Sequence, residues 1–228
     1  TPLLLNHGYP GSIIEMLPLI DALSDKGFHL VVPSLPGFGF SNPVTEAGWD
    51  IGRTARAYAQ LMKELGYEKY GVQGSDIGAG IAQQLCLVDP EHVIGAHTST
   101  DPTAMALTGM LSMVPVEALP EAEQEQVKKW RAYAEDGRGY LALQSTRPQT
   151  IAAALTDSPV GQLSWIVEKF KEWTNPAHEL PEDAVSANQI LTNVSLYWFT
   201  RSGASAAQFL YEAAHAQPNW GAVPTVPT

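Results

Sequence analysis

Residues 74–78 read GSDIG, between a short apolar run, YGV, at residues 70–72 and a helical pattern, IGAGIAQQLCLVD, at residues 77–89. Gly74 and Gly78 stand two residues before and two residues after Asp76. A sharp strand-to-helix turn needs small residues at these positions, because the chain folds back closely on itself. The stretch therefore predicts a strand, a tight turn that pushes the Asp76 side chain outward, and a helix.

Asp76 has two interpretations. It can be the nucleophile of an elbow, in the position where hydrolases with this turn usually carry a serine. It can also be the N-cap of the following helix, because aspartate is a favoured capping residue. The five residues alone are compatible with both interpretations.

The first hundred residues alternate between strand and helix patterns. The predicted strands are PLLLN, FHLVV, KYGVQGS and HVIGAHTS, and the helices between them are SIIEMLPLIDALSDKG, IGRTARAYAQLMKELG and IGAGIAQQLCLVD. The second helix is amphipathic, with an apolar face made by Ala55, Tyr58, Ala59, Met62 and Leu65. This alternation predicts an α/β core over residues 1–100, with a mostly parallel sheet and helices on both faces.

The pattern changes after residue 100. Residues 101–217 show no strand pattern and read as helices separated by Pro or Gly, the first of them over residues 119–145. We expect an inserted all-helical cap over the carboxyl edge of the sheet, where ligands bind in such folds. Residues 218–228 are predicted to begin the strand that returns to the core. Both ends resemble interrupted core strands, so we expect a segment of a longer protein that lacks the rest of the core.

The composition excludes several classes of protein. The net charge of the 228-residue chain is −11, which disfavours nucleic acid as a partner. The single cysteine, Cys86, allows no internal disulfide, and no apolar run reaches the ~18 residues of a membrane helix. These features predict a soluble, cytoplasmic protein without a membrane segment.

A second motif, HGYPGS at residues 7–12, follows the first predicted strand. In hydrolases with an elbow, the loop at this place supplies one backbone N–H of an oxyanion hole, and the residue after the nucleophile supplies another. Those donors would be Tyr9 and Ile77, with Gly8 shaping the loop. Alone, the motif is also compatible with an ordinary Pro-Gly turn before a helix.

Three motifs in this order, HGYPGS, PSLPGFGFS and YGVQGSDIGAGIA, resemble the epoxide hydrolases of the α/β-hydrolase superfamily, specifically the microsomal-type branch. The segments STRPQTIAAALTDSPVGQLSWIVEKFKEWT and ILTNVSLYWFT are similar to the lid of that branch. The resemblance covers nearly the whole chain. It implies the α/β-hydrolase fold with an inserted helical cap.

The resemblance also implies a reaction. Asp76 would open a small apolar epoxide and form a hydroxyalkyl ester, which water activated by a His–acid pair would hydrolyse to a vicinal diol. A carboxylate suits this task because water can cleave the ester at its carbonyl, whereas a serine would leave an ether. Neither a cofactor nor a metal is implied.

The family uses two cap tyrosines as proton donors to the opening ring. Tyr140 stands where the resemblance places the first one. Leu210 occupies the expected place of the second, two residues before Glu212, and Tyr211 is the neighbouring candidate. A phenol is a neutral donor at pH 7, although a lid tyrosine can also simply pack in the core.

The acid and the histidine that the family implies would follow beyond Thr228, so this chain is expected to perform at best the first half-reaction. Asp101 is a weaker candidate for the acid and His215 for the base. Two alternatives stay open: a haloalkane or haloacid dehalogenase, and an inactive truncated member of the family. The exposed sheet edges also predict association, such as a homo-oligomer.

Overall fold

The structure, a computed structural model, describes residues 1–100, 114–175, 177–216 and 224–227. Within these residues four strands form one sheet in the order β2–β1–β3–β4, and every neighbouring pair is parallel. The strands are β1 (Pro2–Asn6), β2 (His29–Val31), β3 (Tyr70–Gly74) and β4 (Val93–Thr98). The predicted parallel sheet is confirmed.

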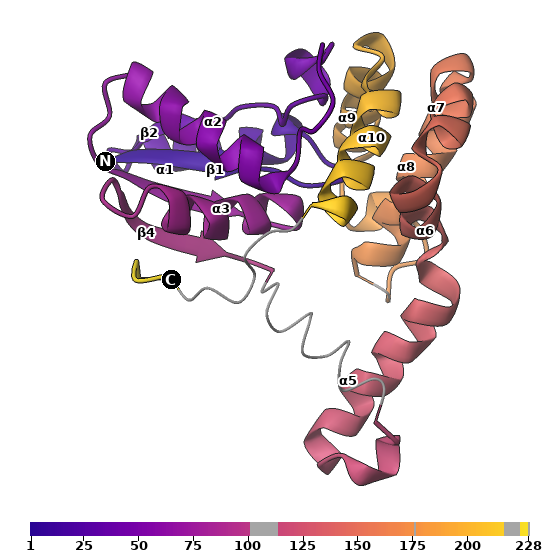
Figure 1. The fold of residues 1–228 in the computed structure, drawn as a ribbon. Coiled ribbons are helices and arrows are strands. Elements are labelled where there is room, and N and C mark those ends of the chain that lie inside the picture. Colours follow the sequence, from indigo (N-terminus) through magenta and orange to yellow (C-terminus); the bar gives the residue numbers. More distant parts are fainter. Residues whose placement is uncertain (101–113, 176, 217–223, 228) are drawn as a thin grey trace.

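Three helices connect the strands: α1 (Leu17–Ser24), α2 (Ile51–Glu64) and α3 (Ile77–Val88). Crossovers between parallel strands are right-handed. The chain steps from β1 to β2 in one direction and then from β2 to β3 and β4 in the other. Right-handed crossovers therefore place α1 on one face of the sheet and α2 with α3 on the other, and Figure 1 shows α2 and α3 side by side.

The strand order also fixes where a site can form. Asn6 at the end of β1 pairs with Gly74 at the end of β3. The loops that follow these two strands start side by side and then lead to strands on opposite sides. Such a reversal opens a binding position at the carboxyl edge of a sheet.

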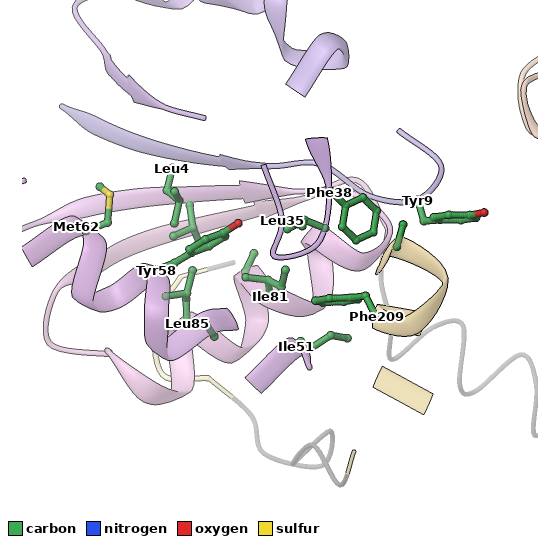
Figure 2. Close-up of a cluster of buried hydrophobic side chains, with 14 of the residues drawn as sticks. Leu4, Tyr9, Leu35, Phe38, Ile51, Tyr58, Met62, Ile81, Leu85 and Phe209 are labelled. Carbon is green, nitrogen blue, oxygen red and sulfur yellow. The ribbon is translucent and has the colours of Figure 1, made fainter. Parts of the chain in front are cut away.

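The core lies between the sheet and the helices α2 and α3. Leu4, Leu35, Phe38, Ile81 and Leu85 belong to its fully buried centre (Figure 2). The predicted apolar face of α2 is buried at Ala55, Tyr58 and Met62, as expected. Leu65 is 51% exposed, because α2 ends at Glu64 and Leu65 is its C-cap.

Helices follow throughout the described part of residues 114–216, beside the carboxyl ends of the strands (Figure 1). They are α5 (Glu121–Ala132), α6 (Gly139–Thr146), α7 (Pro148–Asp157), α8 (Pro159–Trp173), α9 (Ala187–Phe199) and α10 (Ser202–His215). The helical segment expected over residues 119–145 is helical but interrupted. A π-helical turn at Tyr133–Gly137 separates α5 from α6, next to the flexible backbone of Gly137 and Gly139.

Four short helical turns complete the described structure: η1 (Ile13–Met16), η2 (Gly39–Ser41), η3 (Val116–Ala118) and η5 (Pro181–Asp183). The predicted boundaries of core and cap stay predictions, because residues 101–113 and 217–223 lie outside the described residues. Residues 224–227 form no strand, but the carbonyl oxygen of Pro227 accepts a hydrogen bond from Ala96 N–H of β4 at 2.9 Å. In the described parts of the chain, no helix is long and apolar enough to cross a membrane.

Candidate active site

Asp76 adopts a backbone conformation that non-glycine residues rarely take, with φ 51° and ψ −123°. Asp50, before α2, offers a comparison: its φ is −109°, and its carboxylate accepts a hydrogen bond from Arg53 N–H at 2.6 Å. Asp76 makes no capping bond of this kind. It therefore does not cap α3, and its carboxylate points instead toward the loop that follows β1.

Three glycines make this turn possible. A Cβ atom on Gly74 would lie 2.0 Å from the carbonyl oxygen of Gly78, and a Cβ atom on Gly78 would lie 2.2 Å from that of Asn6. A Cβ atom on Gly8 would lie 2.4 Å from the Cβ atom of Asp76. The glycine spacing of the sequence thus reflects close approaches of β1, the turn and α3.

Backbone N–H groups surround the carboxylate of Asp76. Tyr9 N–H donates a hydrogen bond to Asp76 Oδ1 at 2.8 Å. Thr100 Oγ1 accepts a hydrogen bond from Asp76 N–H at 3.1 Å and ties the turn to the end of β4. The structure therefore brings together Asp76, Tyr9 and Ile77, which the sequence motifs singled out separately.

The environment of Asp76 raises the pKa of its carboxyl group. Desolvation is the main cause, and the N–H groups of Tyr9 and Ile77 oppose it. Solvent nevertheless reaches the residue, which is exposed by surface area. The two observations agree if protein atoms crowd the carboxylate on most sides and leave one side open. A partly desolvated and accessible carboxylate is a stronger nucleophile than a fully hydrated one.

His7 is fully buried and holds the loop after β1 in place. Its Nε2 accepts a hydrogen bond from Leu35 N–H at 3.1 Å, so its Nδ1 carries the proton and donates to Gly8 O at 3.0 Å. Burial lowers the pKa of His7 to about 4. Both ring nitrogens are engaged, so His7 is not free to act as a base.

Cap helix α9 is tied to the same loop. Asn193 Nδ2 donates to Pro10 O at 2.9 Å, and Asn193 Oδ1 accepts from Ser12 Oγ at 2.6 Å. Tyr197, one turn later, donates its hydroxyl proton to Gly11 O at 2.7 Å. These buried bonds connect the two motifs HGYPGS and ILTNVSLYWFT and fix the cap above the turn.

Tyr140, at the start of α6, lies beside the site. Its ring stacks on that of Tyr9, with centroids 6.3 Å apart and planes 4° from parallel. Trp173 packs edge-on at 5.1 Å, and Lys169 Nζ lies 5.0 Å from the Tyr140 ring centroid. Burial and a hydrogen bond with Tyr133 raise the pKa of Tyr140, so its phenol stays protonated at neutral pH.

The hydroxyl of Tyr9 extends into the cap. It accepts hydrogen bonds from Trp165 Nε1 at 2.6 Å and from Gln144 Nε2 at 2.9 Å. Gln144 is fully buried. Neither partner was identified as a site residue from the sequence.

The two candidates on α10 lie differently. Leu210 is buried in the apolar cluster that contains Tyr9, and Tyr140 packs against that cluster. The ring of Tyr211 stacks on His215, with centroids 4.1 Å apart, near the end of α10. The structure therefore does not place Tyr211 against Tyr9 or Tyr140, and Leu210 has no proton to donate.

Glu15, in η1, is a mostly buried carboxyl group that the sequence analysis missed. Burial and the charge of Asp76 raise the pKa of Glu15 from 4.5 to about 7. A Cβ atom on Gly11 would lie 1.6 Å from Glu15 Oε1, so the carboxyl group lies directly against the loop. Its sequence neighbours, an ordinary Ile-Ile-Glu-Met run, gave no indication of this environment.

Glu15 predicts a pH dependence of stability. Between about pH 4.5 and 7 the folded state holds a proton on Glu15 that the unfolded state has released. The stability that this bound proton adds to the folded state is therefore fully present below about pH 4.5 and is lost as the pH rises through about 7. We expect the free energy of unfolding of Glu15→Gln, relative to that of the parent, to increase by up to about 3 kcal/mol as the pH rises from 5 to 8. Urea unfolding at each pH measures this difference. The exposed Glu68→Gln should keep the parent's profile, and parallel profiles for parent and Glu15→Gln would refute the prediction.

Other predicted residues lie away from this arrangement. Asp101 lies outside the described residues. His215 stacks on Tyr211 and contacts its carbonyl oxygen at 2.8 Å.

A cavity of about 630 Å³ lies at the opposite edge of the sheet, near Tyr67 and His92, and does not include Asp76. In the described ranges no cluster of three or more His, Cys, Asp or Glu side chains could hold a metal ion.

The chain is similar to known proteins over most of its length. A protein of Stigmatella aurantiaca (strain DW4/3-1), provisionally named an epoxide hydrolase, is 42% identical over 93% of this chain and 49% of its own length. Epoxide hydrolase 1 of the rabbit, Oryctolagus cuniculus, is 33% identical over 92% of this chain and 51% of its own length. The crystal structure of juvenile hormone epoxide hydrolase from the silkworm Bombyx mori matches with a TM-score of 0.77 and 34% identity. That match covers 93% of this chain and 54% of the silkworm chain.

The chain spans about half the length of the curated relatives it matches. The family model of the alpha/beta hydrolase fold matches residues 1–201, which include the sheet, the turn at Asp76 and most of the cap helices. The α/β-hydrolase fold predicted from the sequence is thus confirmed, and the chain belongs to the alpha/beta hydrolase fold family.

Proposed function

We propose that the protein hydrolyses small apolar epoxides to vicinal diols, with Asp76 as the nucleophile. The observation that carries the proposal is the accessible carboxylate on a strained turn, with Oδ1 bound by Tyr9 N–H and the Tyr140 phenol stacked on Tyr9. The similarity to epoxide hydrolases supports the class of substrate. Water is the second substrate.

In the first step Asp76 Oδ2, which is not held by Tyr9 N–H, attacks a ring carbon of the epoxide. A carbon–oxygen bond forms to Asp76 as the ring carbon–oxygen bond breaks. The ring oxygen takes a proton from the Tyr140 phenol, which burial keeps protonated. The product of this step is a 2-hydroxyalkyl ester of Asp76.

In the second step water attacks the ester carbonyl carbon. Negative charge develops on Oδ1, which Tyr9 N–H holds, and Ile77 N–H, which also acts on this carboxyl group, would complete the oxyanion hole. The ester bond then breaks and the diol leaves. A base must take the proton of the attacking water, and we assign it to no residue that the structure describes, since both nitrogens of His7 are engaged.

The test is intact-protein mass spectrometry of the folded chain after incubation with styrene oxide, followed by peptide mapping. We expect a mass gain of one epoxide located on Asp76, or formation of the diol where the second step also proceeds. A folded chain that shows neither result would refute the proposal. A panel of haloalkanes, with halide release as the readout, would show whether the site is that of a dehalogenase instead.

A further inference from the structure

We propose that the hydroxyl group of Tyr9 is a second proton donor of this site and acts on the epoxide oxygen together with Tyr140. The inference rests on the proposed function and adds a catalytic residue to it. Tyr9 would then serve twice, with its backbone N–H on the carboxylate and its side chain on the ring oxygen.

The first observation is the position of the hydroxyl group. The Tyr9 residue is 6% exposed, and its ring lies at the margin of the apolar core. Figure 2 shows that the hydroxyl points away from the buried side chains of that core. The oxygen therefore lies on the cap side of the ring, the side that also carries Tyr140.

The second observation is an incomplete set of hydrogen bonds. An indole N–H can only donate, so the Tyr9 oxygen is the acceptor for Trp165 Nε1 at 2.6 Å. It also accepts from Gln144 Nε2 at 2.9 Å. In this arrangement the Tyr9 O–H hydrogen has no acceptor among the described residues, and the buried Gln144 Oε1 has no donor. A half-turn of the Gln144 amide would pair these two atoms, and an outside acceptor on this side of the ring would take the same hydrogen instead.

The third observation is that a second phenol, Tyr140, lies next to Tyr9. The rings of Tyr9 and Tyr140 are parallel within 4°, so two phenols lie side by side. Tyr9 N–H binds Asp76 Oδ1 at 2.8 Å and the Tyr140 ring stacks on that of Tyr9, so both residues lie near the nucleophile. Leu210 and the stacked Tyr211 supply no donor from α10. Tyr133 hydrogen bonds with Tyr140, and Tyr197 already donates its hydroxyl proton to Gly11 O. Tyr9 is thus the phenol beside Tyr140 that we take as the second donor.

As Asp76 Oδ2 bonds to carbon and the ring bond breaks, both phenols donate hydrogen bonds to the ring oxygen and one proton moves to it. A proton given by Tyr9 leaves a phenolate whose oxygen is already bound by two N–H donors. Accepting those bonds also polarises the O–H group and makes it a better donor. Water returns the proton after the step.

The test compares rates of Asp76 alkylation by styrene oxide, followed by intact mass over a range of epoxide concentrations. Tyr9→Phe keeps the ring and the backbone N–H and removes only the hydroxyl. We expect its maximal alkylation rate to fall roughly 10- to 100-fold, with a half-saturating concentration within threefold of the parent. Tyr140→Phe should give a fall of similar size.

Tyr58→Phe is the matched control. Tyr58 is also 6% exposed, belongs to the same cluster and donates its hydroxyl proton to Ser34 O at 3.1 Å. It should leave the alkylation rate within twofold of the parent. If Tyr9→Phe does not fold, Trp165→Phe removes one donor to the Tyr9 oxygen and should slow alkylation roughly threefold or more.

The outcomes separate the two proposals. Alkylation of Asp76 in the parent with an unchanged rate in Tyr9→Phe would overturn the role of Tyr9 and leave the proposed function intact. An equal loss of rate in Tyr58→Phe would assign the effect to packing and also overturn it. No alkylation of the folded parent would overturn both proposals together.

Discussion

Asp76→Asn is expected to abolish covalent labelling by styrene oxide. The amide cannot open the ring, and no other described carboxylate receives the Tyr9 N–H group. We expect labelling at this position to fall below detection in intact mass spectra, while circular dichroism matches that of the parent. The free energy of unfolding should be equal or slightly higher, because the substitution removes a carboxylate that its surroundings desolvate.

Asp50→Asn is the matched control for this experiment. It makes the same chemical change at the start of another helix, where the carboxylate caps Arg53 N–H. Asparagine caps helices about as well as aspartate, so labelling and stability should both stay close to the parent. Labelling of Asp76→Asn at the parent's rate would show that the epoxide reacts elsewhere and that Asp76 is not the nucleophile.

Gly78→Ala is expected to destabilise the protein by more than about 4 kcal/mol, or to prevent folding. The added Cβ atom would lie 2.2 Å from the carbonyl oxygen of Asn6 and 2.7 Å from that of His7. Both are backbone atoms of β1 and its loop, so relief would require the sheet and α3 to separate. The measurement is the urea midpoint of unfolding, together with the yield of folded protein.

Gly52→Ala makes the same substitution at the equivalent second position of α2. The atoms nearest to its added Cβ atom would be side-chain atoms at 3.5 Å, which is an ordinary van der Waals contact. Alanine should therefore be tolerated and should stabilise the helix by about 0.4–1 kcal/mol. Equal effects at Gly52 and Gly78 would contradict the close approach of α3 to β1.

The fold was largely predictable because its determinants are local. The glycines of GSDIG and the alternation of strand and helix patterns report short-range geometry, and the structure has the expected order of elements. Leu65 was placed on a buried face because it continues the helical spacing of Met62, but the helix stops one residue earlier. The local sequence did not predict whether Asp76 caps its helix, since Asp50 stands in the same position before another helix and does cap it.

The surroundings of the candidate nucleophile were less predictable because they come from distant segments. Gln144 and Trp165 bind the Tyr9 hydroxyl from 135 and 156 residues along the chain. No periodicity or short motif in the sequence predicts these contacts between distant segments. Glu15 lies near in sequence to the loop, but its raised pKa depends on burial and on Asp76, which the chain supplies only after two more strands.

The hydrogen bond from Tyr9 N–H to Asp76 Oδ1 makes two chemically identical atoms unequal. In the proposed reaction the untethered oxygen bonds to the substrate and departs within the diol, and an oxygen from water takes its place. The tethered oxygen never leaves. One oxygen atom of the carboxylate is thus replaced at every turnover while the other stays for the lifetime of the protein, and the Tyr9 N–H marks the one that stays.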